Sequence, residues 1–318
     1  MRKALLLYNP LSGRRRHRRT ADIDAALSVL RAAGVHATAS PTRSGPEASE
    51  QARQAVTAGY DTIFACGGDG TIHDILQGIV GTPAALAVIP LGTANSLAHD
   101  LKIPQAPAAA AKMALSATPK RIAVGRVQHL DFDGNNSVRH FIVAAGVGVD
   151  AHLFYKLNIG IKQQLGMLAY YGKATHLWLT HRMKHFTAEF LETGANEPRR
   201  TTVSELLAVR IRNFGGILQE LAPGASLDRN DMRLVLFRTT SRFYYLLYVI
   251  RGLLRQRWNV RGIELLHGHK ISCQALPATT PGKRDPRIHV EVDGELVGTI
   301  PAEITVVPDA VTVLVPSR

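Results

Sequence analysis

The residues with the clearest capacity for chemistry are in the loop 67–71, which has the sequence GGDGT. This loop follows the apolar run 62–66 (TIFAC), a pattern that predicts a buried strand ending at the first glycine. Glycines let backbone N–H groups approach phosphate oxygens, because no Cβ stands in the way. A helix beginning near Thr71 would add the positive end of its dipole. We therefore predict a phosphate-binding loop, in which Asp69 either holds a cation or orients the loop.

Two further loops have the same character. The segment 90–96 (PLGTANS) follows another apolar run and offers a close approach, a hydroxyl and an amide at Gly92, Thr93 and Asn95. The segment 9–13 (NPLSG) also ends an apolar run, and the basic run 14–19 follows it. These arginines could clamp phosphates, although such a charge run is also typical of a solvated surface. The three loops together predict the walls of one nucleotide site.

The elements that would position these loops alternate along the first third of the chain. Hydrophobic periodicity predicts strands at 3–8, 35–39, 62–66 and 85–89, and helices at 22–33, 46–58, 72–79 and 94–101. Strands that alternate with helices indicate parallel βα units, which bind ligands at the carboxyl ends of their strands. We therefore predict an α/β fold with a doubly wound N-terminal domain over 1–122.

The character of the chain changes near residue 122. Beyond it most apolar runs are β-rich, interrupted by two predicted helical insertions at about 150–181 and 241–254. We predict a C-terminal antiparallel β-sandwich domain over 123–300, which would hold the substrate. The last residues, 301–318, are predicted strands that return to the first domain.

Composition limits the cellular compartment and the kinds of partner that we expect. Cys66 and Cys273 are the only cysteines, which argues against a disulfide framework or a structural zinc site and favours the cytoplasm. The longest apolar stretch, 243–254, is interrupted by Arg251 and is too short to span a membrane. The net charge of +13 favours an anionic partner, either nucleic acid or acidic lipid headgroups. The alternative is that a GC-rich genome favours arginine, so that the charge reflects no specific anionic partner.

The ordered set of motifs resembles the diacylglycerol kinase catalytic domain superfamily. This superfamily includes bacterial lipid kinases, sphingosine kinases and ceramide kinases, and is related to NAD kinases and phosphofructokinases. The resemblance rests first on NPLSG (9–13), GGDGT (67–71) and PLGTANSLA (90–98). It continues through AAGVGVDAHL (144–153), KQQLGMLAYY (162–171), VRIRNFGGILQELAPGA (209–225) and VEVDGELVG (290–298), and so spans nearly the whole chain.

The resemblance implies a role for each matching residue. Nucleotide binding falls on Asn9, Thr42, Gly67, Gly68, Asp69, Gly70, Thr71, Gly92, Thr93 and Asn95. The family's Asp-Gly-Glu motif falls on residues 293–295, which makes Glu295 the catalytic base and Asp293 a secondary, positioning or metal-linked group. The residues alone predict only a tight hairpin turn there, between strands at 287–293 and 295–300.

The cofactors that the resemblance implies are ATP and Mg²⁺, with Asp69 near the metal. Relatives have an acid-rich stretch at a structural magnesium site, where this chain has Asp228 and Asp231 separated by Arg229 and Asn230. The arginine puts that second site in doubt, although either aspartate could still contribute. Two further departures are His73-Asp74 in place of Asn-Glu, and Ser96 in place of an aspartate.

We therefore expect an ATP-dependent lipid kinase that transfers the γ-phosphate to the hydroxyl of a diacylglycerol-like or related lipid. Aromatic and basic residues mix in the segments 153–186 and 242–258, which favours peripheral contact with an anionic membrane on its cytoplasmic face. One alternative is a kinase with a soluble substrate, such as an NAD kinase. Another is a nucleic-acid-binding regulator, but no helix-turn-helix or stacking motif supports it, and no nucleic-acid partner is expected.

Overall fold

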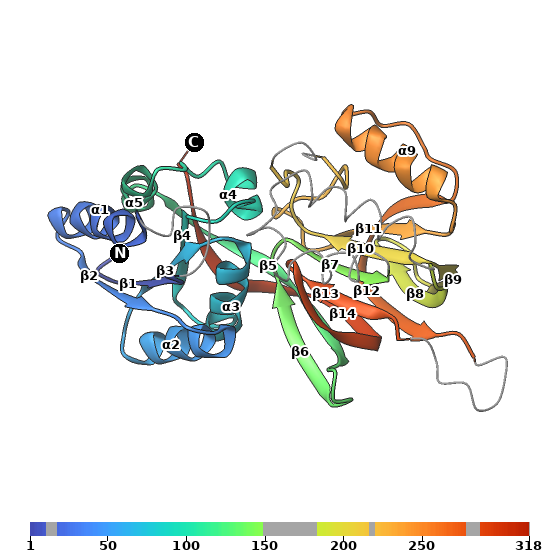
Figure 1. Ribbon diagram of the computed structural model, residues 1–318, viewed down its shortest axis with the longest axis horizontal. Coiled ribbons are helices and arrows are strands. Elements are labelled where there is room, and N and C mark those ends of the chain that lie inside the picture. The colour runs from blue at the N-terminus through green and yellow to red at the C-terminus, as the bar shows by residue number, and fades with distance from the viewer. Residues whose placement is uncertain (11–17, 149–182, 216–219, 278–286, 318) are drawn as a thin grey trace.

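The computed structural model describes residues 1–10, 18–148, 183–215, 220–277 and 287–317 (Figure 1). Two lobes lie side by side along the long axis of the molecule. The first lobe contains β1 (Lys3–Tyr8), α1 (Arg19–Ala32), β2 (His36–Pro41), α2 (Gly45–Thr57), β3 (Thr62–Gly67), α3 (Asp69–Ile79), β4 (Ala85–Pro90), α4 (Ser96–Asp100) and α5 (Pro107–Leu115).

The strands of this lobe form a parallel sheet in the order β2-β1-β3-β4. Helices α1 and α5 pack together on one face, and α2 and α3 pack together on the other (Figure 1). The strand order reverses at β1, which pairs with β2 on one side and β3 on the other. In doubly wound folds ligands bind in the crevice at such a reversal, outside the carboxyl ends of the strands. The predicted α/β class is confirmed, and the carboxyl ends of β1 and β3 lie side by side at this reversal, with Tyr8 opposite Cys66.

The helix boundaries follow from local chemistry. Helix α2 begins at Gly45, one residue before the predicted start, because the Ser44 side chain accepts the Glu47 N–H at 3.3 Å and Pro46 lies in the first turn. Helix α4 is shorter than the predicted 94–101, since Asn95 has left-handed backbone angles (φ 51°) that a helix cannot include. Helix α1 starts at Arg19, three residues before the predicted start at Asp22.

The second lobe is antiparallel and rich in β-structure, as predicted. Among the described residues its strands are β5 (Thr118–Leu130), β6 (Asn136–Phe141), β7 (Ala144–Gly148), β8 (Phe186–Glu192), β9 (Arg199–Val203), β10 (Glu205–Val209), β11 (Met232–Phe237), β12 (Ile263–Ala275), β13 (His289–Val292) and β14 (Glu295–Val315), and the helix α9 (Arg242–Leu253) lies outside the sheet. Most of its buried apolar side chains form a core of their own, separate from the core around β1, β3 and β4. A smaller cluster lies between α9 and strands β10 to β12.

Strand β14 joins the lobes. It begins at Glu295 in the second lobe, pairs with β13 and β5, and ends beside β4 in parallel, with Thr312 opposite Ala85. The strands predicted over 301–318 are therefore part of one strand that starts at Glu295, with a register shift between Val307 and Val311 where the β5 pairing is irregular. The turn before Glu295 is thus tied through one strand to the parallel sheet of the first lobe. The domain boundaries at 122 and 300 stay a prediction.

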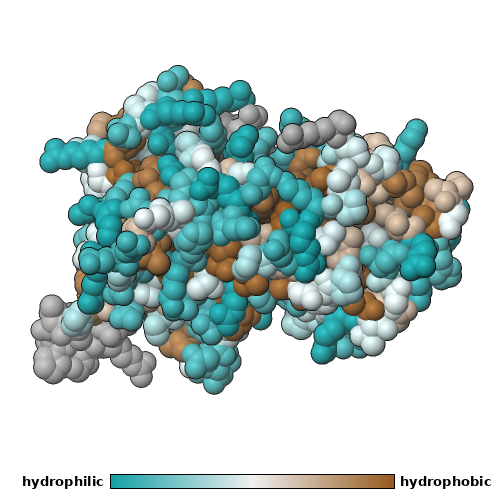
Figure 2. Space-filling view, turned by 180° about the vertical axis from the view of Figure 1, so that it is seen from behind, coloured by the Kyte–Doolittle hydropathy of each residue, from teal (hydrophilic) through white to brown (hydrophobic). Residues whose placement is uncertain are grey.

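The helical insertion predicted at 150–181, with most of the segment 153–186, lies outside the described residues. The second predicted insertion, 241–254, is α9. Within the described ranges, no helix is long and apolar enough to cross a membrane. The face shown in Figure 2 is mostly hydrophilic, with hydrophobic side chains in separate patches.

Candidate active site

The glycine loop connects β3 to α3 and leaves no room for side chains. A Cβ placed on Gly67 would lie 2.2 Å from the Thr71 hydroxyl oxygen, so the threonine side chain folds back onto the loop. Gly68 is the N-cap of α3 with an extended backbone, and as a glycine it has no side chain to accept the first N–H groups of the helix. A helix start of this kind offers unpaired donors and a positive dipole end to an anion.

The second predicted loop lies directly against the first. A Cβ on Gly92 would stand 2.4 Å from the Cα of Gly68, so the two backbones touch at a distance that only glycine permits. Asn95 closes the second loop, because its side-chain oxygen accepts the Gly92 N–H at 2.9 Å. The backbone of the predicted phosphate site is therefore formed by both loops, 67–71 and 90–96.

Asp69 joins the two loops. Its carboxylate accepts the N–H of Ser96 at 3.0 Å and the N–H of Leu97 at 3.3 Å, both at the start of α4. Burial raises the pKa of Asp69 above its usual value, these two bonds oppose the rise, and the nearby charge of Asp293 adds to it. The acid in the glycine loop therefore has a structural explanation, since both of its oxygens already bind backbone donors.

The Asp-Gly-Glu motif forms the tight turn that its spacing predicts. Asp293 and Gly294 both have positive φ, 50° and 90°, as a two-residue hairpin turn requires. The Asp293 carboxylate accepts three successive backbone N–H groups, from Ile142 at 3.1 Å, Val143 at 2.9 Å and Ala144 at 3.1 Å. It thereby anchors the turn to the segment that enters β7.

Glu295 follows this turn and reaches the glycine loop. A Cβ added to Gly70 would lie 3.2 Å from the Glu295 carboxylate oxygen, so the carboxylate stands against a loop 225 residues earlier in the chain. The side chain is solvent-exposed, yet partial desolvation raises the pKa of Glu295. The charge of Asp74 raises it further, while His73 opposes the shift. A carboxylate with a raised pKa is a stronger proton acceptor once it is ionised.

The other predicted nucleotide residues lie along the same edge of the first sheet. Parallel pairing sets Tyr8 opposite Pro41 and Cys66, so Asn9 and Thr42 follow β1 and β2 beside the glycine loop. Thr42 and Thr71 are buried, Asn9 is half-buried and Thr93 is exposed.

The basic run is described only at its end. Arg19 is 3% exposed and donates from Nη2 to the carbonyl of Leu91 at 3.2 Å, so it supports the second loop from behind. Arg18 is exposed, and residues 14–17 lie outside the described part of the chain. The predicted phosphate clamp of this run stays a prediction.

The stretch 228–231 lies apart from the glycine loop. Arg229 donates to both carboxylate oxygens of Asp231, and Thr193 and His267 also contact this carboxylate. Burial raises the pKa of Asp231, but the bonds from Arg229 and the charge of His267 outweigh it and hold the pKa at about 2. Asp228 pairs with Lys120 at the surface. The cation beside Asp231 is thus the guanidinium of Arg229.

Sequence reasoning missed the residues that connect α3 to the second lobe. His73 is buried, and its Nδ1 lies 3.4 Å from the Asp293 carboxylate. One turn later the Gln77 side chain exchanges two hydrogen bonds of 2.9 Å with the backbone of His140. The signal was available at His73-Asp74, the pair that departs from the family pattern directly after the loop. These contacts hold the Asp-Gly-Glu turn against the helix that begins in the glycine loop.

Steric contact between the loops gives a graded prediction. Gly92→Ala should raise the KM for a nucleotide bound at these loops at least about tenfold, because its Cβ would meet the Gly68 backbone at 2.4 Å and force the loops apart. Gly68→Ala should do less, since its Cβ would lie 3.2 Å from the Gly92 Cα. Steady-state kinetics of both variants measure the order. Equal KM values for the two variants would show that the loop contact does not shape the nucleotide site.

Comparison with known proteins agrees with this geometry. A family model described as "Diacylglycerol kinase catalytic domain" matches residues 3–127. A diacylglycerol kinase of Bacillus subtilis is 25% identical over 315 residues, which covers 95% of this chain and 93% of that protein. One from Staphylococcus aureus is 31% identical over 174 residues, covering 54% and 52%. A solved diacylglycerol kinase structure from Bacillus anthracis covers 99% of this chain and 96% of its own, with a TM-score of 0.69 at 17% identity, and shows the shared fold.

The chain has a parallel α/β lobe and an antiparallel β-rich lobe, and its residues 3–127 match the diacylglycerol kinase catalytic domain. Over nearly its whole length it is similar to a bacterial diacylglycerol kinase.

Proposed function

We propose that this protein transfers the γ-phosphate of ATP to the hydroxyl of a diacylglycerol-like or related lipid. The observation that supports this most is the contact of the Glu295 carboxylate with Gly70. It brings the proposed base to the loop that would hold the phosphates. The transfer needs the phosphate and hydroxyl to be held in line, so positioning and charge do most of the work.

The residues around the glycine loop fit a nucleotide. At Gly67, Gly68 and Gly92 the backbone packs too closely against neighbouring loop atoms for a side chain to fit, and the first turn of α3 has N–H groups that could bind an anion. We assign phosphate binding to the loop 67–71 and to Thr93, with Asn9 and Thr42 at the neighbouring strand ends. Asn95 and Asp69 shape the cradle through the bonds they make to the second loop.

Magnesium would neutralise charge on the phosphates. Among the described residues, no group of three or more His, Cys, Asp and Glu side chains is placed to hold a metal. Proteins commonly bind Mg²⁺ through one or two carboxylates together with substrate phosphates. We therefore propose that the ion arrives with ATP, with Asp69 as the nearest loop carboxylate. The ion pairs of Asp228 and Asp231 make a second site at 228–231 the weaker proposal.

Glu295 would accept the hydroxyl proton as the hydroxyl oxygen attacks the γ-phosphorus and ADP leaves. Asp293 would act as a positioning residue, because its carboxylate already accepts hydrogen bonds from three backbone N–H groups. The lipid would come from the cytoplasmic face of an anionic membrane, on which the protein would be peripheral.

An acceptor panel tests the proposed substrate class. Labelled ATP is incubated with diacylglycerol, a sphingoid base or phosphatidylglycerol in mixed micelles, and with NAD in solution. Label in one of the lipids supports the proposal and names the substrate. Label in NADP alone would assign the chain to a soluble substrate instead.

The pH profile should report the environment of Glu295. The base must be ionised, so kcat should fall as the pH is lowered through a pKa that lies above the ordinary glutamate value of about 4.3. Asp74→Asn removes a negative charge that raises this pKa, and should move the acidic limb of the kcat profile to lower pH. An acidic limb in the same place in both proteins would show that another group controls it.

A further inference from the structure

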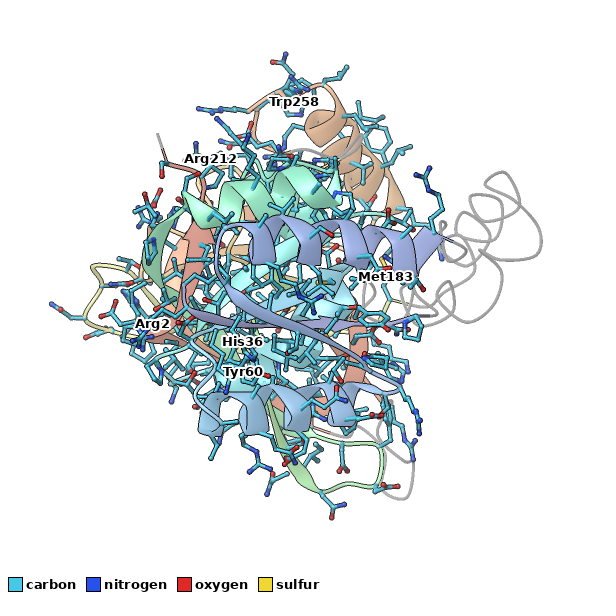
Figure 3. All side chains as sticks on the ribbon, turned by 90° about the vertical axis from the view of Figure 1, so that its left-hand side faces the viewer. Arg2, His36, Tyr60, Met183, Arg212 and Trp258 are labelled. Carbon is cyan, nitrogen blue, oxygen red and sulfur yellow. The ribbon has the colours of Figure 1, made fainter. Side chains whose placement is uncertain are left out.

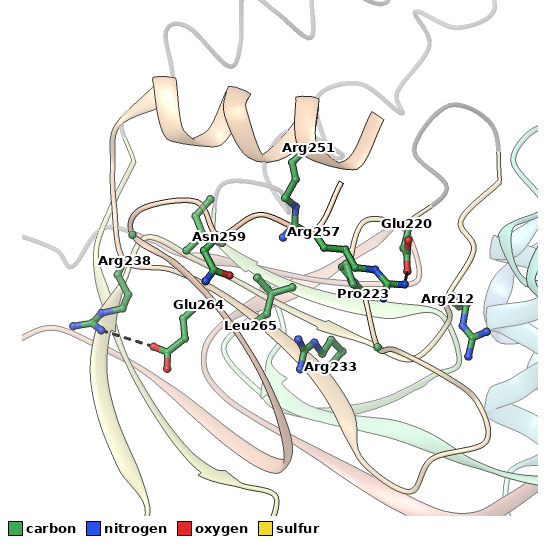
Figure 4. A pocket seen from close by; sticks show the side chains of 13 residues that line it. Arg212, Glu220, Pro223, Arg233, Arg238, Arg251, Arg257, Asn259, Glu264 and Leu265 are labelled. Carbon is green, nitrogen blue, oxygen red and sulfur yellow. Dashed lines mark ion pairs between the residues drawn. The ribbon is translucent and has the colours of Figure 1, made fainter. Parts of the chain in front are cut away.

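A second region with concentrated charge lies between α9 and the sheet. A cavity of about 950 Å³ there is lined by five arginines and two glutamates (Figure 4). We call it the arginine pocket, and its arginines are Arg212, Arg233, Arg238, Arg251 and Arg257. No residue assigned to phosphoryl transfer lines it. Its size suits a small-molecule ligand or a lipid headgroup.

Three of these arginines form no ion pair in the part of the chain that the structure describes. Arg251 is 3% exposed and extends from α9 into the pocket, with its guanidinium 4.2 Å from the centre of the Tyr248 ring. Its Nη2 donates to the Leu221 carbonyl at 3.5 Å, and its Nε has no partner among the described residues. Arg233 comes from β11 on the sheet side, and its buried Nε likewise has no hydrogen-bond partner within the described ranges. Arg212 is exposed at the end nearest the first lobe.

The two glutamates do not balance this charge. Glu264 is paired with Arg199 at 3.0 Å and with Arg238 at 3.8 Å, and Glu220 is paired with Arg257 at 3.5 Å. The pocket therefore keeps an excess of positive charge around a water-accessible space. Guanidinium groups match the oxygens of phosphate with paired N–H donors, so a phosphate group is the ligand that this pocket fits.

Helix α9, which forms one wall of the pocket, is apolar on both sides. Its inner face buries Tyr245 and Tyr248, whereas its outer face leaves Phe243 66% exposed and Leu246 47% exposed. The outer stripe continues at helical spacing through Val249, Ile250, Leu253 and Leu254. A surface helix normally presents polar residues outward, so this stripe indicates contact with an apolar phase.

The charges beside this stripe indicate that the apolar phase is a membrane with an anionic surface. The segment 242–263 contains five arginines and no acidic residue. Trp258 is 39% exposed and stands between Arg257 and Asn259, which both line the pocket, so the apolar surface reaches the pocket rim. Figure 3 shows Trp258 and Arg212 at the same end of the molecule as α9. Apolar, aromatic and basic residues together are typical of segments that lie in an anionic membrane surface.

We propose that the arginine pocket binds the phosphate group of an anionic phospholipid while the outer face of α9 lies in the membrane that supplies it. This is a docking site distinct from the site of Glu295. It depends on the proposed function only in taking a membrane as the place where the protein works.

Vesicle binding without ATP tests the proposal. Sedimentation with phosphatidylcholine vesicles, with and without phosphatidylglycerol, is measured for wild type, for the double variant Arg212→Gln/Arg233→Gln and for Leu246→Gln. The matched control is Arg2→Gln/Arg43→Gln, which removes the same charge from exposed positions in the first lobe. The pocket variant should bind phosphatidylglycerol vesicles at least about tenfold more weakly than wild type, and the control within about twofold. Leu246→Gln should also bind these vesicles more weakly than wild type, since α9 would lose apolar contact.

Equal vesicle binding by the pocket variant and the control would overturn the proposal. A pocket-dependent rise in Tm with inorganic phosphate, without any pocket effect on vesicles, would also overturn it, because the source would be a free anion. The Tm of the double variant shows whether it is folded. If it is unfolded, Arg212→Gln alone, at an exposed position, replaces it in the vesicle assay. Phosphorylation of a short-chain, water-soluble diacylglycerol is measured in parallel. Its absence in wild type would count against the proposed function and leave the docking result intact.

Discussion

Replacing Glu295 with glutamine is expected to lower kcat by about 10²- to 10⁴-fold while changing the Kd for ATP by no more than about twofold. The amide keeps the size of the side chain and its place against Gly70, but it cannot accept the hydroxyl proton. The loss should therefore fall on the chemical step. Single-turnover rates and nucleotide titration measure the two quantities separately.

Glu197→Gln provides the matched control, because Glu197 is exposed and lies in the turn between β8 and β9. It should keep wild-type kcat. If Glu295→Gln also kept it, the base would be another group, and the contact between the Asp-Gly-Glu turn and the glycine loop would be structural.

Asp69→Ala should weaken ATP binding at least about tenfold and lower the free energy of unfolding by about 1–3 kcal/mol. The substitution leaves the N–H groups of Ser96 and Leu97 without their acceptor and frees the second loop from the first. This result differs from that of Glu295→Gln, which should leave ATP binding and stability unchanged. Isothermal titration with ATP and chemical denaturation measure the two effects.

Asp133→Ala is the control for this second substitution, since Asp133 is an exposed aspartate in the turn between β5 and β6. Unchanged stability in Asp69→Ala, together with lost activity, would contradict a joining role. Such a result would favour direct contact of Asp69 with the metal or the phosphates.

Much of the first lobe could be predicted because its signals are local. Apolar runs of strand length, helical periodicity and glycine-rich breaks follow one another, and β1 to β4 begin within one residue of the predicted starts. The start of α4 could not be predicted, because it depends on the backbone of Asn95 and on a carboxylate from α3. Strand β14 was predicted in pieces, since Pro308 and Asp309 look like a break in the sequence although the ladder resumes beyond them.

The residue types of the candidate site could be predicted from the sequence, but their hydrogen-bond partners could not. The resemblance selected Asp69, Asp293 and Glu295 together, and local pattern alone did not separate their roles. The separation comes from contacts between distant parts of the chain. Two backbone N–H groups of α4 donate to Asp69, and three successive backbone N–H groups at the start of β7 donate to Asp293, whereas Glu295 stays exposed against Gly70. The arginine pocket was not predicted, because its residues are spread from 212 to 265 and meet only through the fold.

Transfer of the γ-phosphate from ATP to a lipid can be measured directly. Wild-type protein and Glu295→Gln are incubated with γ-labelled ATP, Mg²⁺ and diacylglycerol in mixed micelles, and the label is measured in the organic extract. If Glu295 is the base, we expect labelled lipid with the wild-type protein and at least about a hundredfold slower labelling with the variant. Label that stays in the aqueous phase with wild type, or enters lipid at the same rate with both proteins, would contradict it.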